Sequence, residues 1–255
     1  MKVKPDFPTI LVTNDDGIYA EGLKVLAEAL SSLGTVWIVA PQHEQSAVGH
    51  SLTLHRPLRV YKMGERKLAV DGTPTDCVGL AVNGLLNKKP DLLVSGINMG
   101  GNLGDDITYS GTVSAAWEGT LLGIPSFAIS TLPDDNEVYV FPPAAEFACR
   151  LAKAILKYGL PPNTLLNVNV PNPEGKSIRG YRITRQGRRI FGESVVEKVD
   201  PRGKKYYWIG GKAIGFEDIP DSDLLAVHEH YISVTPILLD LTNYAAREEM
   251  LKWEI

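Results

Sequence analysis

The sequence is poor in cysteine and contains no long apolar run. Cys77 and Cys149 are the only cysteines among 255 residues, and neither belongs to a Cys-x-x-Cys pair or a Cys/His cluster. This count excludes a disulfide scaffold and a zinc finger, and we expect both thiols to be buried in a reducing cytoplasm. No segment approaches the roughly 18 apolar residues of a membrane span, and the run Ile10–Val12 is too short for a secretory signal. The sequence therefore predicts a cytoplasmic protein that does not enter a membrane.

A basic excess is also absent. Lys and Arg number 26 against 30 Asp and Glu, which gives a formal net charge of -4. Proteins dedicated to duplex nucleic acid normally carry a positive balance, so duplex DNA and RNA are excluded as partners. An acidic chain can still take a nucleotide as its substrate when a metal ion offsets the phosphate charge. The Gly-x-Gly-x-x-Gly fingerprint of dinucleotide binding does not follow the first predicted strand.

The first 40 residues predict a βαβ unit. A short apolar run at 9–13 is typical of a strand buried on both faces. Leucines at spacings of three and four then predict an amphipathic helix over 23–33, with Gly34 at its C′ position. A second strand is expected at 35–40, ended by Pro41. Strand, helix and strand in this order imply a parallel pair with a right-handed crossover.

The same alternation continues to Val170. Further elements are predicted at the following ranges: helices 77–86, 113–122 and 144–158, and strands 91–95, 126–130 and 165–170. This order predicts a doubly wound, Rossmann-like α/β fold with a mostly parallel sheet. We expect residues 1–255 to form a single α/β domain.

Beyond Pro171 the pattern predicts appendages. Strands are expected at 181–184, 193–199 and 205–209, which form a β-hairpin arm over 179–211. The tail, 243–255, is expected to be helical over 245–253. Aromatic residues of the arm suit a subunit contact better than single-stranded nucleic acid, because an isolated hairpin needs a packing partner. We therefore predict a homodimer, or a homotetramer formed by doubling it, assembled through the arm and the tail.

An acidic turn follows the first predicted strand, in the sequence Asn14-Asp15-Asp16-Gly17. Two adjacent carboxylates repel each other, and burying both without a cation is costly. Ligands of open α/β sheets bind beyond the carboxyl ends of the strands, so this pair favours a divalent cation such as Mg²⁺ or Mn²⁺. The alternative is a solvated turn in which Asp caps the following helix.

Two further loops begin at strand ends on the same edge. The loop after 35–40 contains Ser46, and the loop after 91–95 contains Asn98. Their side-chain oxygens are neutral, hard donors that suit the coordination shell of Mg²⁺ or Mn²⁺. We expect both to converge on Asp15 and Asp16, although a single serine is more commonly a turn or cap residue.

A glycine-rich segment, 96–119, leads into the helix predicted to begin at Val113. The sequence Ser110-Gly111-Thr112 lies immediately before that helix, where free N–H groups and the positive end of the helix dipole suit a phosphate. We expect Thr112 to act as the N-cap. The acidic pair Asp105-Asp106 is expected to order the loop.

Five blocks of the sequence resemble the SurE family of survival-protein nucleotidases. They read TNDDG at 13–17, VAPQHEQSAVGHSLTL at 39–54, DGTPTDCV at 71–78, PDLLVSGINMGGNLGDDITYSGTVSAAWEG at 90–119 and ISVTPILLDLT at 232–242. The blocks follow the order of the family over nearly the whole chain. One departure is His230, at a position where the family commonly has glycine; it suggests a different local backbone or subunit contact.

The resemblance implies a metal-dependent 5′-nucleotidase, a phosphoric monoester hydrolase acting on nucleoside 5′- or 3′-monophosphates. It implies that one divalent cation per subunit is held by four residues: Asp15, Asp16, Ser46 and Asn98. It also implies a phosphate site formed by Asn102, Ser110, Gly111 and Thr112. Family members resemble one another in assembling through the hairpin arm and an exchanged C-terminal segment.

The expected reaction is metal-assisted transfer of the phosphoryl group to water. Asp15 acts in it as the general base or, alternatively, as a nucleophile that forms an aspartyl-phosphate. Two non-catalytic alternatives are a receiver-like signalling module and a nucleotide sensor. A receiver needs a phosphoacceptor Asp after its third strand, where this chain has Asn98.

Overall fold

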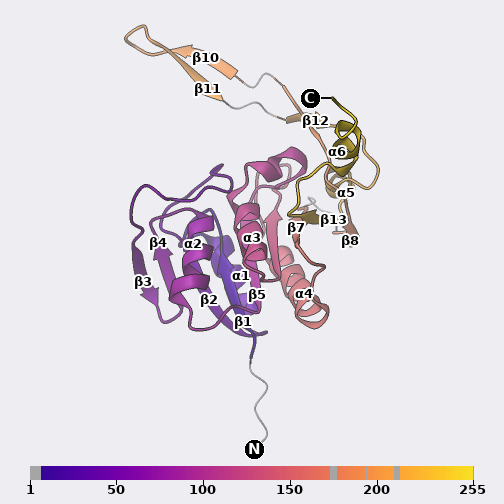
Figure 1. The fold of residues 1–255 in the computed structure, drawn as a ribbon. Coiled ribbons are helices and arrows are strands. Elements are labelled where there is room, and N and C mark those ends of the chain that lie inside the picture. The colour runs from indigo at the N-terminus through magenta and orange to yellow at the C-terminus, as the bar shows by residue number, and fades with distance from the viewer. Residues whose placement is uncertain (1–6, 173–176, 193–194, 210–212, 255) are drawn as a thin grey trace, which may run out of the picture.

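A nine-stranded sheet forms the centre of the molecule (Figure 1). The computed structural model describes residues 7–172, 177–192, 195–209 and 213–254. Within them the strands are, in spatial order, β3 (Val60–Gly64), β4 (Lys67–Val70), β2 (Thr35–Pro41), β1 (Thr9–Thr13), β5 (Leu92–Met99), β6 (Ser126–Thr131), β7 (Thr164–Val170), β13 (Ile232–Leu238) and β8 (Tyr181–Ile183). Neighbours are parallel except in the pairs β3–β4 and β7–β13, so the predicted mostly parallel sheet is confirmed.

Helices cover both faces of this sheet. On one face α1 (Glu21–Leu30) packs with α4 (Pro142–Tyr158), and on the other α2 (Pro74–Leu80) packs with α3 (Gly111–Leu121). Successive residues of β1 point to opposite faces: Ile10 and Val12 pack in the α1–α4 layer, and Leu11 packs in the α2–α3 layer. A strand that is apolar on both faces therefore lies at the centre of a doubly wound fold.

The strand order reverses between β1 and β5. From β1 the chain continues outward to β2 on one side, whereas β5 is followed by β6 and β7 on the other. The carboxyl ends of β1 and β5 consequently flank the topological switch point of the sheet. Ligands of doubly wound folds bind in the crevice that opens there.

Two helices have bounds that differ from the predicted ones. Helix α1 ends at Leu30 with Ser31 as its C-cap, and Gly34 lies outside it. Gly34 is required for another reason: a Cβ at this position would lie 2.2 Å from Pro8 O. Helix α2 begins at Pro74 rather than at 77, because Thr73 and Asp76 form a reciprocal capping box. It also ends early, at Leu80, and a π-helical turn follows over Ala81–Leu85.

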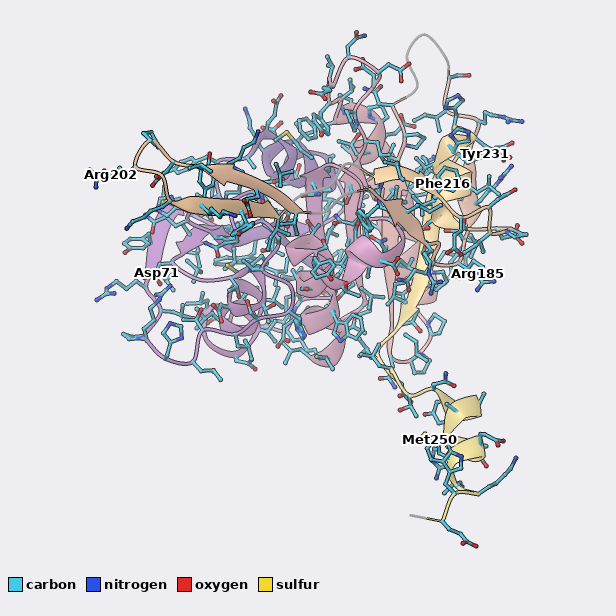
Figure 2. All side chains as sticks on the ribbon, turned by 90° about the horizontal axis from the view of Figure 1, so that it is seen from above. Asp71, Arg185, Arg202, Phe216, Tyr231 and Met250 are labelled. Atoms are coloured by element: carbon cyan, nitrogen blue, oxygen red, sulfur yellow. The ribbon has the colours of Figure 1, made fainter. Side chains whose placement is uncertain are left out.

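A hairpin arm and a tail helix are present; the arm stands off the body in Figure 1 and the tail in Figure 2. The arm is shorter than the predicted 179–211, because its first expected strand, β8, pairs with β13 in the central sheet. The arm consists of β10 (Val195–Val199) and β11 (Lys205–Ile209), with β9 (Arg189–Phe191) and β12 (Ala213–Phe216) paired at its base. The tail helix α6 (Tyr244–Met250) has no buried residue, and Figure 2 shows Met250 lying away from the sheet. The expected bounds at residues 193, 211 and 255 fall outside the described residues.

Several short elements are not indicated by the sequence pattern. They are β3, β4, β9, β12, β13 and the six-residue helix α5 (Asp223–His228). Strand β3 is exposed along its whole length, and β13 contains Pro236, so neither shows the apolar run of a buried strand.

In the described part of the chain, no helix is both long enough and apolar enough to cross a membrane. Both cysteines are free thiols; Cys77 is buried as expected, whereas Cys149 is only partly buried.

Candidate metal and phosphate site

The acidic turn is held at the carboxyl end of β1 by hydrogen bonds within the turn, to the last residue of β2 and to the loop after β2. Asn14 Nδ2 donates to Gly17 O over 3.0 Å. Gln45 N donates to Asp15 O over 2.8 Å, and Ile18 N donates to Pro41 O over the same distance. The turn is therefore anchored on both sides, and its two carboxylates occupy defined positions at the switch point.

Burial raises the pKa of both carboxyl groups. Asp15 is only 7% exposed, and burial is the main reason that its pKa lies above 3.8; a hydrogen bond donated by the Thr112 hydroxyl to Oδ1 opposes the rise. For Asp16, burial and the neighbouring charge of Asp15 raise the pKa to about 6. Two carboxylates that resist ionisation side by side are stabilised by a bound cation.

The loop after β2 brings Ser46 to this turn, together with an acidic residue that the sequence analysis does not identify. Ser46 Oγ donates to Glu44 Oε1 over 2.6 Å, which leaves the lone pairs of the serine oxygen free. The Glu44 charge also contributes to the raised pKa of Asp15 and Asp16, so it lies within electrostatic reach of both. Glu44 lies two residues before Ser46 in the same loop, so the sequence alone could have indicated it as a site residue.

Asn98 lies in β5 itself, one residue before the end of the strand, rather than in the following loop, since β5 extends to Met99. Its Nδ2 donates to Gly100 O over 2.7 Å. This bond fixes the amide so that the carbonyl oxygen, Oδ1, is the atom left for a ligand.

The N-terminus of α3 forms another wall of the site. Ser110, not Thr112, is the N-cap: its Oγ accepts a hydrogen bond from Val113 N over 3.1 Å. Thr112 is fully buried and its hydroxyl is committed to Asp15. The cap lies two residues earlier than expected because the helix begins at Gly111 rather than at Val113. A Cβ on Gly111 would lie 2.8 Å from Asp15 Cβ, so glycine permits the close approach of helix and turn.

Asn102 completes the set from the loop after β5. It is almost fully buried, and its side chain donates to Ser130 Oγ over 2.8 Å. Asn167 and Asn169 hold its backbone from β7.

These elements enclose one open cavity of about 370 Å³. Its lining includes Asp15, Asp16, Ser46, Asn98, Asn102 and Ser110, together with three residues not anticipated as site residues, Glu44, Asp106 and Tyr109. Gly111 and Thr112 lie behind this wall, against Asp15. The residues singled out from three separate loops thus meet at one place.

Asp106 links the cavity to the base of the arm. Its Oδ2 lies 2.5 Å from Arg189 Nε in β9. Burial raises the pKa of Asp106, and the Arg189 charge opposes that rise. This ion pair agrees with the loop-ordering role expected for Asp106.

The donor set fits a hard divalent cation. In the part of the chain described here, no three Asp, Glu, His or Cys side chains form a metal cluster. A cation in this cavity would therefore depend on two carboxylates and on neutral oxygens such as Ser46 Oγ and Asn98 Oδ1. Oxygen-only sites with few carboxylates are typical of Mg²⁺, which keeps several of its waters.

Comparisons with known proteins agree with one another. A family model described as survival protein SurE matches residues 10–193. A 5′-nucleotidase SurE from Geotalea daltonii is 56% identical over 246 residues, which cover 96% of this chain and 99% of that protein. A 5′-nucleotidase SurE from Geobacter sulfurreducens is 55% identical, with 96% and 94% covered. The crystal structure of the SurE protein from Aquifex aeolicus superposes with a TM-score of 0.85 at 47% identity and covers 95% of this chain and 98% of that one.

Proposed function

This chain belongs to the SurE survival-protein family, and from that premise we propose that it is a metal-dependent 5′-nucleotidase that hydrolyses nucleoside monophosphates. The observation that carries the proposal is the meeting of buried Asp15 and partly buried Asp16 with the N-terminus of α3 in one cavity at the switch point. A cation site beside an anion site is the arrangement that phosphoryl transfer requires.

In this proposal Asp15, Asp16, Ser46 and Asn98 hold one divalent cation, Mg²⁺ or Mn²⁺, per subunit. When bound, such a cation polarises a phosphoryl oxygen and neutralises the charge that develops on it. The raised pKa of both carboxyl groups supports the assignment, because the folded chain places them together without a compensating Lys or Arg in the cavity lining.

The phosphate is bound by Asn102, Ser110 and the first N–H of α3, at Gly111. The Ser110 oxygen accepts from Val113 N and keeps its own proton to donate. Thr112 acts through Asp15, to which its hydroxyl is bonded, rather than through the phosphate. Donors fixed in this way stabilise charge on the equatorial oxygens without reorganising during the reaction.

Asp15 is the general base in this scheme. Its Oδ1 already accepts the Thr112 hydroxyl, so Oδ2 is the oxygen that takes a proton from the attacking water. Rapid acid quenching with phosphate-labelled substrate separates this role from nucleophilic attack, which leaves label on the protein.

The proposed partners are a nucleoside monophosphate and further copies of the same chain. The arm and the tail carry large exposed apolar side chains, among them Trp208 (65% exposed), Ile209, Leu241 and Trp253. Surfaces of this kind favour burial in a homodimer or a homotetramer. The unpaired thiols Cys77 and Cys149 support a cytoplasmic location.

A substrate panel crossed with metals tests the function. Nucleoside 5′- and 3′-monophosphates are incubated with Mg²⁺, Mn²⁺ or EDTA, and released phosphate is measured. We expect release from the 5′-monophosphates that depends on the metal. A protein that binds nucleotides under all conditions but releases no phosphate is a sensor and contradicts the proposal.

A further inference from the structure

Asn102 reaches the cavity from a loop that has no regular structure of its own. The loop, residues 100–103, connects the end of β5 to a 3₁₀ turn at Gly104–Thr108. Asn102 is only 8% exposed, so its backbone groups need protein partners. The backbone partners come from β7, and a partner of the side chain comes from β6, rather than from neighbouring loop residues.

Asn169 pairs with the peptide of Asn102 through both atoms of its side-chain amide. Asn102 N–H donates to Asn169 Oδ1 over 2.8 Å, and Asn169 Nδ2 donates to Asn102 O over 3.0 Å. Asn167 Nδ2 donates to the same carbonyl over 2.7 Å. A side-chain amide offers a donor and an acceptor side by side, as a peptide group does. Asn169 therefore holds Asn102 as an additional strand would.

Ser130 holds the side chain of the same residue. Asn102 Nδ2 donates to Ser130 Oγ over 2.8 Å. An amide nitrogen has two N–H groups, so one is left for a ligand in the cavity that Asn102 lines. Ser130 and Asn169 are direct partners in the β6–β7 register. One position in the sheet thus fixes both the backbone and the side chain of Asn102.

Burying these polar side chains in the core carries a desolvation cost. Ser130, Asn167 and Asn169 are fully buried, and Asn167 Oδ1 has no hydrogen-bond partner among the described residues. Apolar side chains would pack the same positions without a desolvation cost. What the polar groups have in common is a hydrogen bond to Asn102.

We propose that Ser130 and Asn169 are positioning residues that aim the free N–H of Asn102 at the phosphate of the substrate. They act through Asn102 and do not touch the substrate. The inference rests on the proposed phosphate-releasing function of this cavity, and it adds two residues from β6 and β7 to the machinery of that reaction.

Ser130→Ala is the test variant, since it removes one hydroxyl with little change of volume. We expect its kcat/KM for a nucleoside monophosphate to fall about 10- to 100-fold, as for other residues that orient a ligand group, with unchanged affinity for Mn²⁺. Ser233→Ala is the matched control. Ser233 is equally buried, lies opposite Asn169 on β13 and has no bond to Asn102, so its loss leaves kcat/KM unchanged.

A double-mutant cycle separates positioning from a general structural effect. If Ser130 acts only through Asn102, Ser130→Ala causes no further loss in an Asn102→Ala background. Asn169→Ala, checked for folding by circular dichroism, is measured in the same way. The inference is overturned if Ser130→Ala is as active as the wild type, or if it lowers kcat/KM by the same factor in both backgrounds.

Binding of inorganic phosphate keeps the test independent of turnover. In the presence of Mn²⁺, phosphate should raise the melting temperature of the wild type and of Ser233→Ala, and less that of Ser130→Ala and Asn102→Ala. A wild type that is active but shows equal shifts in all variants overturns the inference alone. A wild type that neither releases phosphate nor is stabilised by it overturns the proposed function as well.

Discussion

Asp15 and Asp16 owe their chemistry to their surroundings rather than to their identity. The same pair on an exposed loop would ionise at ordinary pH, whereas here burial opposes ionisation of both, and the charge of Asp15 further opposes ionisation of Asp16. Hydrogen bonds from the loop after β2 and from the helix α3 hold the turn in place despite the free-energy cost of burying these carboxyl groups. A bound cation would relieve the repulsion.

The pH dependence of stability in the metal-free protein follows from the pKa of Asp16. This pKa is raised from 3.8 to about 6, so the folded state holds the proton more tightly than the unfolded state. The resulting stabilisation is complete below pH 3.8 and is lost as the pH rises through 6. Asp16→Asn removes this penalty. In EDTA at pH 7.5 the variant should be more stable than the wild type by about 1–2 kcal/mol, allowing for the partial exposure of Asp16.

Urea unfolding of both proteins in EDTA, at pH 4 and pH 7.5, measures that difference. The gain of the variant should be present at pH 7.5 and small at pH 4. A variant that is less stable than the wild type at pH 7.5 would show that the carboxylate is stabilising in the metal-free fold.

His230 occupies a left-handed backbone conformation, with φ of 65°. The expected change of backbone at this position is therefore not required: histidine adopts a conformation that glycine favours, and its N–H donates to Val227 O over 2.9 Å. His230→Gly should raise the free energy of unfolding by about 0.5–1 kcal/mol by relieving the strain of a Cβ at positive φ. His230→Ala, which keeps the Cβ, is the control and should not gain stability in the same denaturation assay.

At the scale of elements, one serine serves both the helix α3 and the proposed phosphate site. Ser110 caps α3 and lines the cavity. Loss of the cap in Ser110→Ala should cost about 1 kcal/mol of stability, and loss of the donor about 2–4 kcal/mol of transition-state stabilisation. Ser110→Gly retains most of the capping preference, so it should lose the activity and keep the stability. Equal activity of the wild type and Ser110→Gly would show that the Ser110 hydroxyl takes no part in the reaction.

The elements that the sequence predicts well are those buried on both faces. Strands β1, β5, β6 and β7 each contain a short apolar run and are largely buried, and the ends of β1 and β5 locate Asp15, Asp16 and Asn98. Exposed β3 and proline-containing β13 lack that pattern and form through pairing with neighbours distant in the chain. The hydrogen bonds that hold Asn102 could not be predicted from the sequence for the same reason. Asn167 and Asn169 of β7 lie 65 and 67 residues further along the chain and reach Asn102 only through the register of the sheet.

At the scale of the whole molecule, apolar surface is concentrated on the appendages. The arm strands β10 and β11 are exposed along their length, and α6 buries no residue. Figure 2 shows the arm tip at Arg202 and the tail at Met250 on widely separated parts of the molecule. Two separate surfaces of this kind can each bind a different copy, which is what a tetramer requires and a dimer does not.

Removal of each appendage should therefore have a distinct effect on assembly. Replacing residues 195–209 with a short Gly-Ser linker should lower the oligomer order by one step, while truncation after Thr242 should destabilise the dimer. Light scattering of the three proteins at micromolar concentration measures both effects. A monomeric intact protein would contradict the proposed assembly.

The central claim is that the paired carboxylates of the β1 turn hold the cation on which phosphate release depends. Its most direct test is phosphate release from AMP as Mn²⁺ is titrated, with the wild type and Asp16→Asn measured side by side. The account predicts that EDTA abolishes wild-type turnover, that Mn²⁺ restores it, and that folded Asp16→Asn stays inactive at saturating Mn²⁺. Wild-type turnover by Asp16→Asn at saturating Mn²⁺ would contradict it.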